Sequence, residues 1–298
     1  MKKIINSIIV FSTLAALFLT GCGSAPKSSD GRLKALTSTT FLADITRNIA
    51  GDRISVDSLL PVGADPHAYQ AAPSDVAKIA ESNLLILNGL EYEHFIEPLL
   101  ENAGGEKLMI EATAGLSPRE DAGSIDPHMW LDPNLVVTYV ENIRDGLIQI
   151  DAGGAEIYTA NADAYIAQLK ELDQWIVEQV NTIPVERRLL VTNHEAVGYF
   201  AERYGFEVVG AVIPSMSTDA GTSAKGLAAL IEQVKAAGAP AIFLGEVENP
   251  DLANQIASET NVKVVDNLYL ESLTDGAPAA TYIDMMKHNV IQIVKALK

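Results

Sequence analysis

Short apolar runs alternate along the chain with segments in which apolar residues recur every three or four positions. The runs predict strands at residues 33–38, 54–60, 84–88 and 107–110, and again at 188–192, 207–212, 241–245 and 262–265. The periodic segments predict helices at residues 41–50, 73–82, 95–102 and 133–150, and again at 196–204, 224–237, 252–259 and 279–297. Strands that alternate with helices favour parallel sheets with helical crossovers, so we expect an α/β fold.

One long periodic segment separates the two halves of this pattern. Residues 156–181 contain no Gly or Pro, and at 1.5 Å per residue they predict a helix of about 39 Å. Leu169, Leu172, Ile176 and Val180 form one apolar stripe along it, and Pro184 follows its end. We therefore expect an N-terminal α/β lobe at residues 33–151, a linking helix at 152–184 and a C-terminal α/β lobe at 185–298. Each lobe is expected to be a parallel β-sheet flanked by helices, and the long helix is expected to be rigid.

The N-terminal segment has the pattern of a targeting signal. Two lysines precede an apolar run at residues 8–19, which is too short for a comfortable membrane span and is typical of a secretory signal peptide. The run ends in Leu-Thr-Gly-Cys at residues 19–22, which resembles a bacterial lipobox. We expect a signal peptide at residues 1–21, lipidation of Cys22 and a flexible tether over residues 22–32. The alternative is an ordinary signal peptide with a chance cysteine. The expected location is extracytoplasmic, lipid-anchored to the membrane at the cell surface or in the periplasm.

Composition narrows the possible chemistry. The formal net charge of −18 argues against nucleic acid as a partner, because phosphate binding needs a basic surface. The single cysteine excludes an internal disulfide and a metal site built from several cysteines. A soft-metal site would therefore have to use histidine and carboxylate, and the chain has five histidines.

Three of the five histidines follow predicted strands or lie on stiffened loops. Asp-Pro-His occurs at residues 65–67 and again at 126–128, each time followed by an aromatic residue and then a proline that begins a helix. Proline fixes its own φ angle and restricts the backbone conformation of the residue before it, so His67 and His128 are presented on stiff loops. His194 directly follows a predicted strand, where ligands bind in open parallel sheets. Three imidazoles with one carboxylate form a closed zinc shell. His94 and His288 lack such a setting and are expected to be structural.

The fourth ligand and the supporting carboxylates stay open at this point. Glu271 and Asp275 both follow the last predicted strand and are both candidates. The acids near the histidines, Asp65, Asp126 and Asp132, are candidates to accept the second imidazole N–H and so fix the tautomer.

Taken together, these motifs resemble the metal-specific solute-binding lipoproteins of ABC transporters, zinc and manganese receptors also called the adhesin-lipoprotein family. The resemblance covers nearly the whole chain from Cys22. It rests on Gly-Ala-Asp-Pro-His at 63–67, Asn-Gly-Leu at 88–90, Asp-Pro-His-Met-Trp-Leu-Asp-Pro at 126–133, Asn-His-Glu-Ala at 193–196 and Glu-Ser-Leu at 271–273.

The resemblance implies one metal in the cleft between the lobes, held by His67, His128, His194 and Glu271. Family members usually have Asp where this chain has Glu271, which leaves Asp275 as the alternative fourth ligand. The implied function is high-affinity capture of a divalent metal ion and its delivery to an ABC permease for import, by a monomer that is not an enzyme.

The choice of metal depends on the donor set. Three imidazoles favour Zn²⁺, whereas Mn²⁺ prefers more oxygen donors, so the expected ion is Zn²⁺ with Mn²⁺ as the alternative. The stretch at residues 117–125 lacks the histidine-rich loop that many zinc receptors of the family carry.

Two other functions fit the sequence less well. An extracellular zinc hydrolase would need an open coordination position, which four protein ligands do not leave, and the chain has no His-Glu-x-x-His motif. A role in cell adhesion rests on the family name alone.

Overall fold

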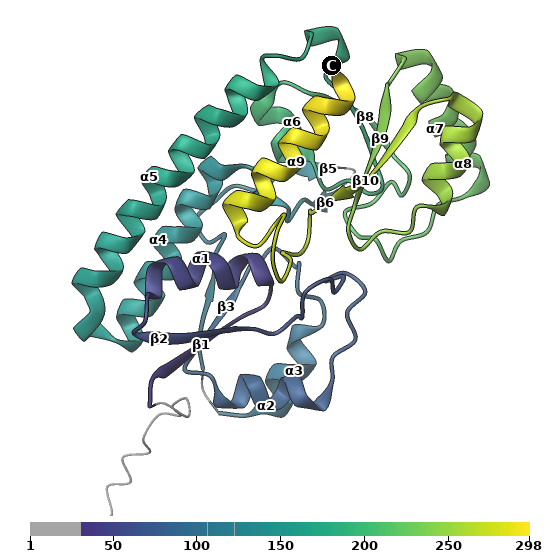
Figure 1. Cartoon of the computed structure of the whole chain (residues 1–298). Helices are drawn as coiled ribbons and strands as arrows, with labels where there is room; N and C mark the ends of the chain where they lie inside the picture. Colours follow the sequence, from purple (N-terminus) through teal and green to yellow (C-terminus); the bar gives the residue numbers. More distant parts are fainter. Residues whose placement is uncertain (1–30, 106, 122) are drawn as a thin grey trace, which may run out of the picture.

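The first lobe of the computed structural model is built on a parallel sheet in the order β2-β1-β3-β4. The structure describes residues 31–105, 107–121 and 123–298. The strands are β1 (Leu33–Thr37), β2 (Ile54–Ser58), β3 (Leu84–Leu87) and β4 (Leu108–Glu111). Helices α1 (Thr40–Ala50) and α4 (Pro133–Ile150) cover one face, and α2 (Pro73–Glu81) and α3 (Ile96–Ala103) cover the other (Figure 1). Because helices cover both faces, all four residues of β3 are apolar and buried.

The second lobe repeats this arrangement with a parallel sheet in the order β10-β9-β7-β8. Its strands are β7 (Leu189–Thr192), β8 (Glu207–Ala211), β9 (Ala241–Gly245) and β10 (Lys263–Leu268). Helices α7 (Ala224–Ala237) and α8 (Asp251–Thr260) pack on one face, and α6 (Gly198–Tyr204) and α9 (Tyr282–Leu297) lie on the other side. The prediction of two parallel α/β lobes is confirmed.

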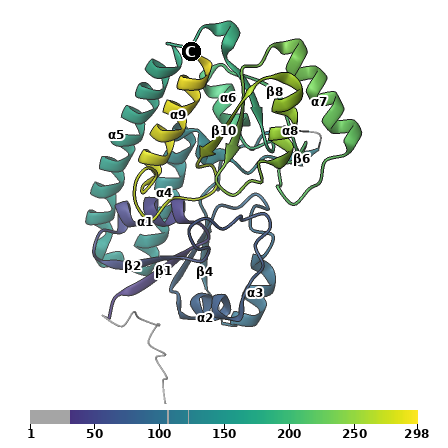
Figure 2. The ribbon, with the colours of Figure 1, turned by 45° about the vertical axis from the view of Figure 1, so that its right-hand side comes forward.

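The long helix α5 (Ala155–Val180) runs along one side of both lobes, with α9 beside it (Figures 1 and 2). Its buried face includes the predicted stripe Leu169, Leu172, Ile176 and Val180 and is extended toward its N-terminus by Tyr158, Ala162 and Tyr165. These residues belong to one continuous apolar core that reaches from β1 and β3 through α5 to α9. A shared core of this kind resists separation of the lobes, because parting them would expose apolar surface to water. We therefore expect relative motion of small amplitude.

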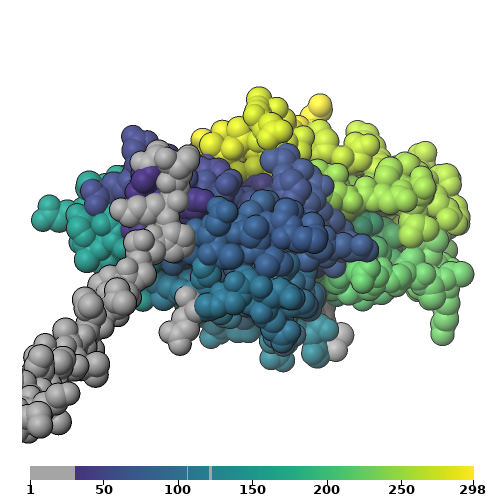
Figure 3. Space-filling view, turned by 90° about the horizontal axis from the view of Figure 1, so that it is seen from below, coloured from purple at the N-terminus to yellow at the C-terminus, as the bar shows by residue number. Residues whose placement is uncertain are grey.

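Polar contacts also join the lobes where the C-terminal segment crosses the first lobe. Thr40 Oγ1 accepts a hydrogen bond from Leu273 N at 2.8 Å, and Asp44 Oδ2 accepts one from Tyr282 N at 2.9 Å. Seen from below, the side chains of the C-terminal segment (yellow) lie directly against those of the first lobe (purple to blue) in Figure 3.

Several boundaries differ from the predicted ones for local reasons. Helix α6 begins at Gly198 rather than 196, because Glu195 N donates to Ser215 O and Thr192 Oγ1 donates to His194 O, which keeps this stretch in a loop. Helix α9 begins at Tyr282 rather than 279, because Thr281 is its N-cap. A small antiparallel hairpin, β5 (Glu120–Asp121) and β6 (Ser124–Ile125), has no counterpart among the predicted strands.

The expected signal peptide at residues 1–21, the lipidation site Cys22 and most of the expected tether lie outside the described residues. Within the described part of the chain, no helix combines the length and the apolar character needed to cross a membrane.

Candidate metal centre

His67, His128, His194 and Glu271 lie together between the two lobes. His67 is on the loop between β2 and α2, and His128 follows the β5–β6 hairpin. His194 follows β7, and Glu271 follows β10. His194 and Glu271 lie just beyond the carboxyl ends of β7 and β10, and His67 lies on the loop that leaves the carboxyl end of β2, where open α/β sheets place their ligands. One potential ligand atom from each residue lies within 4.8 Å of those of the other three.

The separations between these atoms match those of a four-coordinate metal shell. His194 Nε2 lies 3.3 Å from both His128 Nε2 and Glu271 Oε1. Glu271 Oε1 lies 3.5 Å from His128 Nε2 and 3.8 Å from His67 Nε2. Donors at about 2.1 Å around a tetrahedral ion are about 3.4 Å apart. The cluster could therefore take an ion with little rearrangement, and His67 would have to move the most.

Two atoms of the cluster fit a cation for an additional reason. Within the described residues, His67 Nε2 and Glu271 Oε1 are buried and have no hydrogen-bond partner. A buried polar atom without a partner costs free energy, whereas a cation between these two atoms would satisfy both. The donor set thus fits a divalent ion that accepts both nitrogen and oxygen ligands.

The two Asp-Pro-His segments adopt the same local turn. His67 N donates to Asp65 Oδ1 at 2.9 Å, and His128 N donates to Asp126 Oδ1 at 3.0 Å. The second oxygen of Asp65 accepts a hydrogen bond from Thr218 Oγ1 at 2.6 Å, which joins the two lobes beside His67. Asp65 therefore fixes the backbone of the His67 loop, and its contacts do not include the His67 ring.

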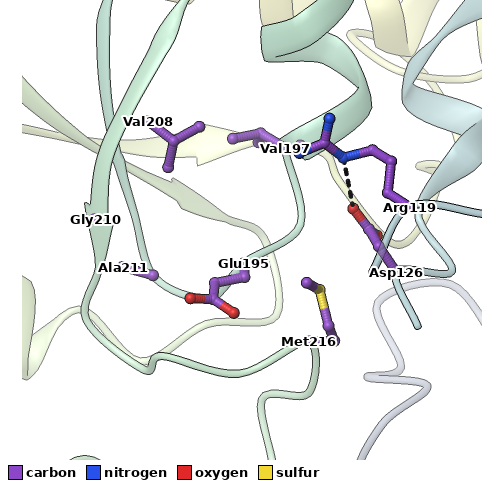
Figure 4. A pocket seen from close by; sticks show the side chains of 9 residues that line it. Arg119, Asp126, Glu195, Val197, Val208, Gly210, Ala211 and Met216 are labelled. Atoms are coloured by element: carbon purple, nitrogen blue, oxygen red, sulfur yellow. Dashed lines mark ion pairs between the residues drawn. The ribbon is translucent and has the colours of Figure 1, made fainter. Parts of the chain in front are cut away.

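Asp126 in addition contacts the ring of its own histidine. Its Oδ1 lies 2.9 Å from His128 Nδ1, which leaves Nε2 directed at the cluster. Its Oδ2 faces Arg119 Nε at 3.9 Å (Figure 4). Burial lowers the pKa of His128, but its hydrogen bond to Asp126 and the negative charge of Glu271 outweigh burial and raise the pKa above its ordinary value.

Arg119 and Asp126 line a cavity of about 180 Å³ behind His128, next to strand β8 (Figure 4). Glu195 and Met216 point into the same space. Arg119 also forms an ion pair with Glu202 on α6. None of the four clustered residues lines this cavity, so it is separate from the cluster and is linked to it through Asp126, which contacts the His128 ring.

His194 has a carboxylate partner from the turn that follows β9. Its Nδ1 lies 2.7 Å from Glu248 Oε1, and both side chains are almost fully buried. Burial lowers the pKa of His194, but the hydrogen bond to Glu248 and the negative charge of Glu271 outweigh burial and raise the pKa to about 10.

Hydrogen bonds hold both the backbone around Glu271 and its carboxylate in place. The buried carboxylate of Glu246 accepts hydrogen bonds from the backbone N–H groups of Leu270, Glu271 and Ser272. Tyr92 donates its hydroxyl to Glu271 Oε2 at 2.6 Å, which leaves Oε1 facing the histidines. Burial raises the pKa of Glu271, but the three nearby imidazoles lower it well below its ordinary value, so the carboxylate stays ionised.

A pocket of about 390 Å³ gives access to the cluster from solvent. His67 and Tyr92 line its inner wall, and Glu91, His94 and Ser217 lie among its other lining residues. His67 is the one member of the cluster that lines this pocket, whereas the other three lie deeper.

The remaining sequence candidates lie elsewhere. Asp275 is exposed and is not part of the cluster, and Asp132 accepts from Asn134 N as the N-cap of α4. His94 is exposed at the pocket, and His288 contacts Asn267 O from α9. Sequence reasoning missed Tyr92, Glu246 and Glu248. The position of the two glutamates directly after predicted strand 241–245 is the signal that would have found them.

Replacing His67 with alanine is expected to lower metal affinity by about 10- to 100-fold and to leave the fold intact. Because His67 lines the solvent pocket, water can replace its imidazole as a ligand. Chelator competition measures the affinity, and circular dichroism with thermal unfolding of the metal-free protein checks the fold. Unchanged affinity would remove His67 from the site.

Comparisons with known proteins agree with this geometry. The family model described as "Zinc-uptake complex component A periplasmic" matches residues 36–296. The chain is 38% identical to the manganese-binding lipoprotein MntA of Halalkalibacterium halodurans, over all of this chain and 99% of MntA. It is 31% identical to the manganese ABC transporter substrate-binding lipoprotein PsaA of Streptococcus pneumoniae, again over all of this chain and 99% of PsaA.

Solved structures include members that bind different metals. The periplasmic zinc binding protein TroA of Treponema pallidum matches with a TM-score of 0.84 and 28% identity, over 90% of this chain and 99% of TroA. The Mn-bound periplasmic metal binding protein of Candidatus Liberibacter asiaticus matches with a TM-score of 0.81 and 28% identity, over 90% of this chain and all of that protein.

Proposed function

Because the chain belongs to the family of the zinc-uptake complex component A, we propose that it captures one Mn²⁺ ion and delivers it to the permease of an ABC transporter. The chain is a metal-binding, substrate-binding protein of ABC transport and is not an enzyme. Like the relatives named lipoproteins, it is extracytoplasmic and membrane-anchored. We propose Cys22 as the lipidated residue.

The observation that carries this proposal is the convergence of four donors from both lobes. We propose that His67 and His128 of the N-terminal lobe (33–151) and His194 and Glu271 of the C-terminal lobe (185–298) hold the ion, with residues 152–184 as the link. Since both lobes supply ligands, a small displacement of one lobe against the other would loosen the ion for release.

The names of the relatives support manganese as the ion that is delivered. Two relatives that match over the full chain, MntA and PsaA, are named as manganese proteins. The sequence favoured zinc, and the same donor set is expected to bind Zn²⁺ more tightly than Mn²⁺ in vitro, because Zn²⁺ lies above Mn²⁺ in the Irving–Williams order of affinity. Affinity alone therefore does not identify the delivered ion, since availability also decides which metal is loaded in the cell.

Deletion of the gene in the source cell is expected to lower cellular manganese and leave zinc nearly unchanged. Manganese and zinc contents are measured by mass spectrometry after growth in manganese-poor medium. The wild-type gene should restore manganese, and a gene carrying His194→Ala should not. A fall in zinc with unchanged manganese would identify a zinc receptor. No change in either metal would contradict the import function.

A further inference from the structure

We propose that Glu248 is a positioning residue that holds His194 in the orientation and tautomer needed to bind metal. This inference rests on the proposed function and extends it to a residue that makes no contact with the ion itself. A histidine ligand binds best when its other ring nitrogen donates to a fixed acceptor, because the hydrogen bond sets the tautomer and the ring plane.

The geometry assigns this acceptor to Glu248. Glu248 Oε1 lies 2.7 Å from His194 Nδ1, so the proton is placed on Nδ1. Nε2 then points at Glu271 Oε1, 3.3 Å away, and is the nitrogen left for an ion once its proton is displaced. The side chains of Glu248 and His194 are 1% and 0% exposed, so water does not compete for this hydrogen bond.

Glu248 is itself fixed before any ion binds. Its second oxygen accepts a hydrogen bond from Gly245 N, and its own N–H donates to Gly245 O at 3.3 Å. These contacts form a tight turn at the carboxyl end of β9. A Cβ at Gly245 would lie 3.4 Å from the Glu248 carboxyl carbon, so the turn places the carboxylate close against the backbone.

The three histidines differ in how their rings are supported. The acceptor for His128 Nδ1 is Asp126 Oδ1, which lies 2.9 Å away and belongs to a residue two positions earlier on the same loop. His194 has an acceptor from the turn after β9, 54 residues away in the chain. For the His67 ring, no comparable carboxylate acceptor occurs among the described residues. Glu248 thus supplies to the C-terminal lobe the support that the Asp-Pro-His frame supplies to His128.

The test replaces Glu248 with alanine and with glutamine, and uses Glu259→Gln as the matched control. Glu259 is an exposed acid on α8 of the same lobe, so its substitution removes the same charge far from the cluster. Affinities for Zn²⁺ and Mn²⁺ are measured against a chelator, and zinc dissociation is followed by stopped flow. Loss of such a supporting partner typically costs 10- to 100-fold in metal affinity.

A spectroscopic readout separates positioning from general damage. In zinc-loaded wild type, the imidazole Nδ1–H protons of His128 and His194 should both give downfield, slowly exchanging NMR signals. Glu248→Ala should remove the His194 signal and keep the His128 signal. In Glu248→Gln one of the two acceptor oxygens becomes an NH₂ group, which only donates, so either His194 Nδ1–H or Gly245 N–H loses its acceptor. We therefore expect a shifted signal and a weakened site.

The outcomes distinguish this inference from the function on which it rests. A 10- to 100-fold loss with Glu248→Ala, loss of the His194 signal and an unchanged Glu259→Gln control would support it. Wild-type affinity and an intact His194 signal in both Glu248 variants would overturn it while leaving the metal-capture function in place. Absence of tight binding by the wild type would instead reject the proposed function.

Discussion

Replacing Glu271 with alanine is expected to lower the affinity for Mn²⁺ and Zn²⁺ by at least about 100-fold. Glu271 supplies the negative charge of the proposed shell, and its side chain is 1% exposed. Removing one partner of a buried charge pair typically costs about 3–5 kcal/mol, and about 1.4 kcal/mol is a factor of ten in affinity. The loss should exceed that of His67→Ala, because water from the pocket reaches His67 more readily than Glu271.

Chelator competition with the Glu271 variants measures this loss, and Asp275→Asn is the matched control. Asp275 lies four residues away on the same segment, is exposed and was the other sequence candidate for the fourth ligand. The control should bind metal as the wild type does. Reduced affinity in Asp275→Asn with normal affinity in Glu271→Ala would transfer the ligand role to Asp275.

Glu271→Gln tests whether charge or shape dominates. The amide keeps the size of the side chain, and its oxygen can still face the histidines, but it carries no charge to balance a divalent ion. We therefore expect the glutamine variant to lose most of the affinity that the alanine variant loses. Near-wild-type affinity in Glu271→Gln would show that donor geometry matters more than charge.

Much of the fold could be predicted because the sequence patterns that indicate its strands and its long helix are local. Continuous apolar runs such as that of β3 indicate strands buried on both faces, and the absence of Gly and Pro marks α5 within one residue at each end. Helix starts were less predictable. The start of α6 depends on Ser215, a residue that is distant in sequence and accepts from Glu195 N.

The candidate cluster could be located because its residues stand in recognisable frames. His67 and His128 share the Asp-Pro-His turn, and His194 follows a strand. Glu271 depended on family resemblance, because many acids follow strands in this chain. The residues that hold these ligands in place were harder to predict. Tyr92 is 179 residues from its partner Glu271, and Glu248 is 54 residues from its partner His194. Such pairings arise from the tertiary fold, and no periodicity encodes them.

The shared apolar core and the proposed ligands together constrain how the ion can leave. The core joins the lobes through α5 and α9, so wide separation of the lobes would be costly. The cluster, however, needs only small displacements, because donor separations of 3.3 to 3.8 Å leave little tolerance. A shift of about an ångström between lobes would break the bond to at least one ligand. Release can therefore follow a motion that keeps the core intact.

Lowering the pH from 8 to 6 is expected to weaken metal binding by at least about 100-fold. The pKa of His194, raised to about 10, means that the metal-free cluster holds a proton at neutral pH, and the raised pKa of His128 favours a second. A metal ion must displace these protons, and each displaced proton lowers the affinity about tenfold per pH unit. One proton gives about 100-fold over this range, and two give about 10,000-fold.

Chelator competition at several pH values measures the slope, and calorimetry in buffers of different ionisation enthalpy counts the released protons. Affinity that does not change between pH 8 and 6 would contradict a histidine-dominated site.

The metal-free protein provides the control for unfolding. Because the pKa of His194 is raised on folding, its contribution to stability is present below about pH 6.5 and is lost as the pH rises toward 10. The lowered pKa of Glu271 contributes stability above about pH 4.3, which is lost only as the pH falls further. The metal-free fold should therefore be no less stable at pH 6 than at pH 8, so weaker binding at pH 6 would report proton competition at the cluster.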